Sequence, residues 1–259
     1  MESVKIIEYS KPKLKNPIMI QGLVGIGNVG RIAVSFLIDE LKAKKFAELI
    51  SKHFMHFVLV DDNSIIKPLS NEFYYTRVNN TDFILLVGDA QSSTTEGHYE
   101  IAEEIVKFAK KYDVSEIITI GGLNIGEAVE EPKVIGASNN LDMIKKYSKF
   151  GVEFSPTEIG SIVGASGLVV TVAKYYNIKA VCLLGQTVGY PIIPDPRSSK
   201  SVLEVLVRAF KLDLDFSKLN KKIEEMERFM KRMEEVQRKA ISQMFRPASE
   251  EKEKLRYIG

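Results

Sequence analysis

The chain has 259 residues, of which 45% are hydrophobic, and its acidic and basic side chains nearly cancel to a formal net charge of +2. This size and hydrophobic fraction allow one large domain with a sizeable core, with or without an appendage. The near balance of charge excludes broad binding to phosphate backbones, which requires a clustered basic excess, so no nucleic-acid partner is expected.

Short apolar runs separated by turn residues predict strands in the first half of the chain. The expected strands are residues 4–9, 18–21, 54–60, 65–66, 73–77 and 83–87, and residues 31–45 have helical periodicity. The strands expected between residues 54 and 87 follow one another without a helix, which suggests antiparallel strands inside a fold that otherwise alternates strands and helices.

The chain after residue 88 repeats a strand, a turn of small residues and a helix. Strands are expected at residues 116–120, 134–137 and 180–184, and helices at 96–112, 139–150, 168–176 and 198–210. Such repeats predict an α/β fold, a three-layer sandwich. Several loops should then converge at the carboxyl edge of the sheet, where α/β proteins usually place ligands.

The motif Gly25-x-Gly27-x-x-Gly30 lies between the strand at 18–21 and the helix at 31–45. This spacing is typical of a dinucleotide-binding loop, whose glycines let the backbone approach a pyrophosphate at a helix N-terminus. Such loops also need an acidic residue about 20 positions later, and Asp61 and Asp62 lie about 30 beyond Gly30. We therefore interpret the glycines as a tight turn that seats the helix on the sheet. The alternative is a cofactor loop made by Gly25, Gly27, Asn28, Gly30 and Asp89.

No pattern typical of a catalytic or metal site is present. There is no Walker loop and no His-Glu-x-x-His motif, and His53 and His56 have no acidic or cysteine companion nearby in the sequence. Ser166 lacks the Gly-x-Ser-x-Gly elbow of a hydrolase. Cys182, the single cysteine, lies in an apolar run and excludes a disulfide or cysteine cluster. We expect no enzymatic activity, no cofactor and no metal.

No run approaches the roughly 18 apolar residues of a membrane helix, and the first residues alternate charged and apolar side chains unlike a secretion signal. A cytoplasmic protein without membrane contact is therefore expected.

The pattern changes after residue 215. Apolar side chains recur at alternating spacings of four and three, the a/d pattern of a long amphipathic helix of the coiled-coil type. This seam begins with Leu219, Ile223, Met226, Met230 and Met233. Such a helix either lies on its own domain or leaves it to self-associate or bind a partner, and its narrow seam and charged flanks favour the second. We divide the chain into an α/β core domain at 1–215, the helix at 216–245 and a flexible tail at 246–259.

Five motifs resemble the archaeal branch of the PAC2 family of proteasome assembly chaperones. They are Gly22-Leu-Val-Gly-Ile-Gly-Asn-Val-Gly30, Gly88-Asp-Ala-Gln91, Ile120-Gly-Gly122, Gly164-Ala-Ser-Gly-Leu168 and Pro191-Ile-Ile-Pro-Asp-Pro-Arg197. The resemblance covers most of the chain and implies a fold similar to that of nucleoside phosphorylases, without established catalysis. It also implies a homo-oligomer, for which a tetramer is favoured over a pentamer, and binding to the 20S core particle in assembly or activation.

The resemblance further implies a role for the last five residues, which are Leu255, Arg256, Tyr257, Ile258 and Gly259. Proteins of such systems dock a C-terminal hydrophobic-Tyr-any motif between α-ring subunits of the proteasome, with the carboxylate near a pocket lysine. Here Tyr257 is third from the end, and Arg256 precedes it. We expect this tail to engage the α-ring without ATP. The alternatives are a nucleotide- or nucleoside-binding enzyme and a coiled-coil scaffold for another partner.

Overall fold

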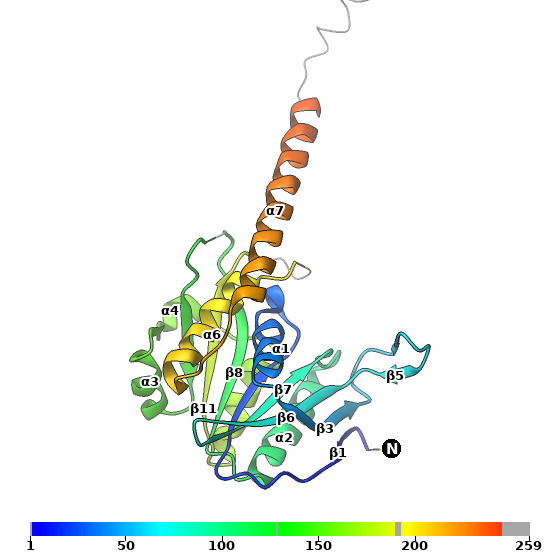
Figure 1. Cartoon of the computed structure of the whole chain (residues 1–259), viewed down its shortest axis with the longest axis vertical. Coiled ribbons are helices and arrows are strands. Elements are labelled where there is room, and N and C mark those ends of the chain that lie inside the picture. The colour runs from blue at the N-terminus through cyan, green and yellow to red at the C-terminus, as the bar shows by residue number, and fades with distance from the viewer. Residues whose placement is uncertain (1, 128, 190–192, 245–259) are drawn as a thin grey trace, which may run out of the picture. The chain divides into compact units, whose positions relative to one another are not determined.

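The computed structural model describes residues 2–127, 129–189 and 193–244, without the side chains of residues 158, 230 and 233–244 (Figure 1). The chain forms two compact units, Met1–Leu219 and Asn220–Gly259. The second unit contains most of helix α7 (Ser217–Met244).

The first unit is built on a mixed sheet of nine strands in the order β1-β3-β6-β7-β2-β8-β11-β9-β10. These strands are β1 (Val4–Glu8), β2 (Ile18–Gly22), β3 (Lys44–Ser51), β6 (Asn71–Val78), β7 (Thr81–Gly88), β8 (Glu116–Asn124), β9 (Val134–Ser138), β10 (Val152–Glu153) and β11 (Lys179–Thr187). The central strands β7, β2, β8 and β11 are parallel, whereas β1, β3, β6 and β7 pair antiparallel. The predicted mixture of antiparallel strands with an alternating α/β fold is confirmed.

Helices cover both faces of this sheet. Helices α2 (Thr95–Lys111) and α5 (Ala165–Tyr175) pack on one face, and α1 (Val29–Glu40), α3 (Leu141–Ser148) and α6 (Pro196–Phe210) pack on the other (Figure 1). A short α4 (Pro156–Ile159) completes the set in this unit. Successive side chains of a strand point to opposite faces, so Met19 of β2 enters one core while Ile18 and Ile20 enter the other. The molecule is therefore a mixed α/β protein with a sheet buried between helices.

The helix predicted at 31–45 ends earlier, at Glu40, and β3 begins at Lys44. Lys42 adopts a left-handed φ of 48°, which stops the helix. Phe46 and Leu49 of β3 are buried, but a bulge between Lys45 and Ala47 interrupts the alternation of the strand. This irregular spacing explains why the sequence pattern did not predict β3.

The strand predicted at 54–60 is also shorter than expected. Only β4 (Val58–Val60) forms, and it pairs with β5 (Ile66–Pro68) in a separate two-stranded sheet. All three residues of β4 are exposed, so the apolar run is not a core strand of the large sheet.

No helix of the described residues is long and apolar enough to cross a membrane.

Glu8 links the edge of the sheet to α2. It pairs with the Lys111 ammonium and accepts a hydrogen bond of 2.5 Å from the Tyr112 hydroxyl. Burial raises the pKa of the Glu8 carboxyl, but the hydrogen bonds from Lys111 and Tyr112 outweigh it and hold that pKa below its ordinary value. Ionised Glu8 therefore stabilises the fold at neutral pH, and this contribution is lost as the pH falls through the lowered pKa.

We predict that Glu8→Gln lowers the free energy of unfolding at neutral pH by roughly 1.5 to 3 kcal/mol, the net value of hydrogen bonds to a charged group. The difference from the unmodified protein should shrink as the pH falls through the lowered pKa, because protonated Glu8 resembles glutamine. Urea unfolding at a series of pH values measures it. The control is Glu104→Gln, which removes an exposed pair with Lys107 within α2 and should change stability by less than about 0.5 kcal/mol. A difference that persists unchanged in acid would contradict this role of Glu8.

Candidate functional site

The segments that carry the sequence motifs meet at one edge of the sheet. Because β2, β7, β8 and β11 are parallel, their carboxyl ends lie together, and the loops that follow them converge there. The turn Ile26–Asn28 and the N-terminus of α1 follow β2, Gln91 follows β7, and Asp195 lies between β11 and α6. The predicted convergence of loops at the carboxyl edge is confirmed.

The glycines at this edge allow backbone segments to touch. A Cβ atom at Gly30 would overlap the carbonyl oxygen of Ile120, and one at Gly22 would overlap the carbonyl oxygen of Gly30. A Cβ atom at Gly122 would overlap the carbonyl oxygen of Ile26. Gly27 has a left-handed φ of 60°, which also favours glycine. The glycines therefore seat α1 against β2 and β8.

Two polar side chains hold the loops to one another. Gln91 donates from Nε2 to the carbonyl oxygen of Val24 and accepts at Oε1 from the backbone N–H of Ala165, at 2.5 and 3.0 Å. Asp195 caps α6 by accepting at Oδ1 from the N–H of Ser198 at 2.9 Å, and its Oδ2 accepts from the Thr187 hydroxyl at 2.6 Å. Its own N–H donates to the carbonyl oxygen of Gly27 at 2.7 Å. Both side chains thus have a connecting role.

Two cavities lie near these loops. One of about 60 Å³ is lined by Gly25 and Gly30 together with Gln21, whose buried Oε1 has no partner among the described protein groups. The other, of about 190 Å³, is lined by the ion pair of Arg31 and Asp89. Both are smaller than the roughly 300 to 1,000 Å³ of typical ligand pockets. The structure thus places Asp89 in one cavity and Gly25 and Gly30 in the other, whereas Gly27 and Asn28 of the alternative cofactor loop line neither.

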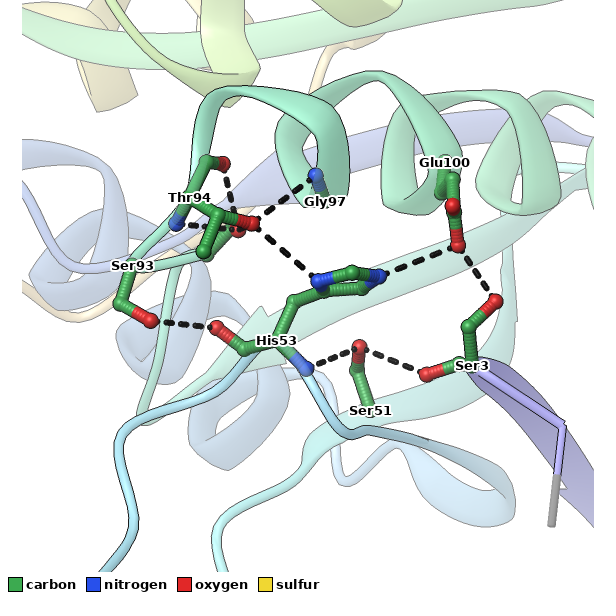
Figure 2. Close-up of polar contacts among 8 residues, drawn as sticks. Ser3, Ser51, His53, Ser93, Thr94, Gly97 and Glu100 are labelled. Atoms are coloured by element: carbon green, nitrogen blue, oxygen red, sulfur yellow. Dashed lines mark hydrogen bonds and ion pairs between the residues drawn. The ribbon is translucent and has the colours of Figure 1, made fainter.

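The fold brings an acidic residue next to His53, although no immediate neighbour of His53 in the sequence is acidic. Figure 2 shows the imidazole between Thr94 and Glu100, with Nδ1 3.1 Å from the Thr94 hydroxyl and Nε2 3.1 Å from the Glu100 carboxylate. Hydrogen bonds from Ser3 and His53 lower the pKa of Glu100 below its ordinary value. Sequence reasoning missed Glu100 because no local signal marks a contact between residues 47 positions apart.

The order of hydroxyl, imidazole and carboxylate resembles a hydrolase triad, but Thr94 is already engaged. Its Oγ1 accepts the N–H of Gly97 at 3.1 Å and caps α2. The Ser93 hydroxyl donates to the carbonyl oxygen of His53 (Figure 2). The backbone N–H of Ser93 donates to the same oxygen. The cluster therefore ties the chain after β3 to the start of α2.

Within the described part of the chain, no group of three or more His, Cys, Asp or Glu side chains is placed to hold a metal ion.

Half of the exposed large hydrophobic side chains in the described structure lie in residues 55–66. We call this group the hairpin surface, and it consists of Met55, Phe57, Val58, Leu59, Val60, Ile65 and Ile66. The sequence marked this run as apolar, but alternation alone did not reveal that the chain leaves it uncovered.

The residues predicted to contact partners are only partly described. The tail from Leu255 to Gly259 lies outside the described residues, as do the side chains of Met230 and Met233. Leu219 is 2% exposed and packs in the core of the first unit, whereas Ile223 and Met226 are partly buried. The role of this seam and of the tail stays a prediction.

Comparisons with known proteins extend over most of the chain. The sequence model of the PAC2 family matches residues 19–234. Two uncharacterized proteins of Methanocaldococcus jannaschii are 37% identical over 95% of this chain and 93% of their own, and 29% identical over 93% and 95%. The crystal structure of Pyrococcus furiosus PbaB, an archaeal proteasome activator, has a TM-score of 0.85 and 38% identity, and covers 90% of this chain and 100% of that chain. That of Pyrococcus furiosus PbaA, an archaeal homolog of proteasome-assembly chaperone, has a TM-score of 0.75 and 30% identity over 99% of this chain and 100% of its own.

We predict that Gly30→Ala destabilises the protein by roughly 1 to 3 kcal/mol, the usual cost of overpacking, although alanine is the better helix former. The new Cβ would push α1 away from the Ile120 carbonyl. The control is Gly25→Ala, because Gly25 is extended and a Cβ there meets only Gln91 Nε2 at 3.7 Å. Thermal unfolding of both variants measures the effect. Equal stability of the two variants would contradict the packing role of Gly30.

Proposed function

The chain belongs to the PAC2 family, and we propose that it is a non-enzymatic protein that binds the proteasome 20S core particle. It would be either a homologue of the assembly chaperones that assists assembly of the core particle, or an activator of the core particle that needs no ATP. The observation that carries this proposal is the 38% identity with PbaB, an archaeal proteasome activator, over 90% of this chain. At this identity and coverage, the likeness concerns the sequence as well as the fold.

The chemistry of the carboxyl edge supports a protein without catalysis. Gln91 and Asp195 use their polar atoms to hold loops together, and Thr94 serves as a helix cap. The cavities of about 60 and 190 Å³ are small for a nucleotide. A nucleotide- or nucleoside-binding enzyme is therefore not favoured. We also propose that the α/β unit is of the nucleoside phosphorylase type, in keeping with its central parallel strands and antiparallel edge.

We propose that the contact with the core particle is made by the tail from Leu255 to Gly259. Its Leu, Tyr and Ile side chains and its terminal carboxylate are suited to a pocket between α-ring subunits, where a lysine would meet the carboxylate. We further propose a homo-oligomer, a tetramer, located in the cytoplasm. Several tails on one oligomer would bind one ring together, and the second contact then occurs at a high effective concentration.

Removal of residues 255–259 should abolish binding to purified core particle in a pull-down, while light scattering shows an unchanged oligomer. The matched control is Lys252→Ala with Glu253→Ala, which preserves the net charge and leaves the last five residues intact. This control should bind as the unmodified protein does. Full binding by the shortened chain would contradict the tail mechanism.

The position of Tyr257 provides a second test. Arg256→Leu combined with removal of Gly259 places an apolar residue before a tyrosine that is second from the end, as in the family motif. We predict that this variant binds the core particle at least about tenfold more tightly, a gain of about 1.4 kcal/mol. Arg256→Leu alone is the control, since its tyrosine stays third from the end. A titration that finds the same affinity for both variants would exclude docking by that motif.

A further inference from the structure

We propose that copies of this chain assemble through the hairpin surface, which is formed by β4, β5 and the apolar residues beside them. This rests on the homo-oligomer of the proposed function and identifies the surface that builds it. The occupant of the surface is a second copy of the chain.

The hairpin has a defined shape of its own. Val58, Leu59 and Val60 pair with Pro68, Lys67 and Ile66. Asp61 closes the turn, because its Oδ1 accepts from the N–H groups of Asn63 and Ile65 at 3.0 Å each, and its Oδ2 lies 2.8 Å from the Lys67 ammonium. The charged groups Asp61 and Lys67 thus satisfy each other within the hairpin.

The base of the hairpin is fixed to the body. Phe54 is buried in the core, and the residue before it, His53, is held by Thr94, Glu100 and Ser93 (Figure 2). The cluster around His53 therefore acts as a positioning device for the segment that follows it.

Both faces of the hairpin are open. Successive residues of a strand point to opposite faces, yet Val58, Leu59 and Val60 are 54%, 40% and 66% exposed. Among the residues that the structure describes, neither outer edge of this small sheet pairs with another strand. An isolated hairpin of two strands is at best marginally stable in water, so it needs a surface to pack against. The described part of the chain does not provide that surface.

The exposed residues of the hairpin surface are suited to an oligomer interface. All seven are apolar, they are between 40% and 67% exposed, and they lie on both faces of the hairpin. Contiguous apolar residues of this kind mark interaction sites, and a second copy of the chain would remove them from water.

The composition of the surface favours a second copy over a charged partner. No Lys, Arg, Asp or Glu occurs from Met55 to Val60. Interfaces of permanent homo-oligomers are more apolar than those of transient complexes and resemble a domain core cut in half. The free strand edges add main-chain donors and acceptors that a copy of the same hairpin can satisfy.

The test is the mass of the full chain in solution, measured by light scattering over a wide range of concentration. The variant is Val60→Lys with Ile66→Glu. These residues are cross-strand partners, and they are 66% and 67% exposed, so opposite charges there preserve the hairpin and the net charge. We expect the unmodified protein to be a multimer and this variant to have the mass of a single chain.

The control places the same two charges on exposed apolar residues elsewhere. Leu141→Glu at the start of α3 and Tyr175→Lys at the end of α5 both suit the helix dipole, and these residues are 73% and 79% exposed. The control should keep the multimer. A monomeric unmodified protein, or a multimer that survives in the hairpin variant, would overturn the proposal.

Hydrogen exchange of the unmodified protein provides a measurement that needs no variant. Amides of residues 57–67 should exchange more slowly at concentrations where the multimer forms than in the dissociated chain, and equal exchange would overturn the proposal. The pull-down with core particle separates this outcome from the proposed function. Assembly through the hairpin without binding to the core particle would refute the function alone, and binding by a protein that assembles elsewhere would refute the hairpin alone.

Discussion

The structure depends on the close approach of three backbone segments at the carboxyl edge of the sheet. Gly30 of α1 touches the carbonyl of Ile120 in β8, and Gly22 at the end of β2 touches Gly30. Side chains at these positions would force the helix away from the sheet, so glycine is needed for packing. Gln91 connects the loop after β2 to the start of α5, and the N–H of Asp195 bonds to the turn before α1. A pattern typical of cofactor binding is used here to pack a helix on a sheet.

The sequence predicted the features that repeat with a regular period or that glycine marks. The four helices expected after residue 95 and the convergence of loops at the carboxyl edge could be predicted in this way. The strand β3 could not, because its bulge breaks the alternation. The exposure of Val58 to Val60 also escaped prediction, since an apolar run does not reveal whether another segment covers it. The contact of His53 with Glu100 depends on tertiary structure alone.

The structure supports an interpretation in which the function lies outside the loops of the carboxyl edge. Gln91 and Asp195 hold these loops to one another, and the polar groups around His53 hold the base of the hairpin. The hairpin and the tail are separate in the sequence, so assembly of copies and contact with a partner would be made by different segments. Such a division explains how an α/β fold rich in glycine loops can serve in binding without catalysis.

Binding of the proteasome core particle through the last five residues is proposed here as the function of the chain. A calorimetric titration of purified core particle with the full chain, repeated in the presence of a synthetic peptide with the sequence of residues 255–259, tests this binding directly. We predict saturable binding that this peptide displaces and that the same five residues in another order leave intact. Absence of binding, or binding that a saturating concentration of the peptide does not change, would contradict docking through the tail.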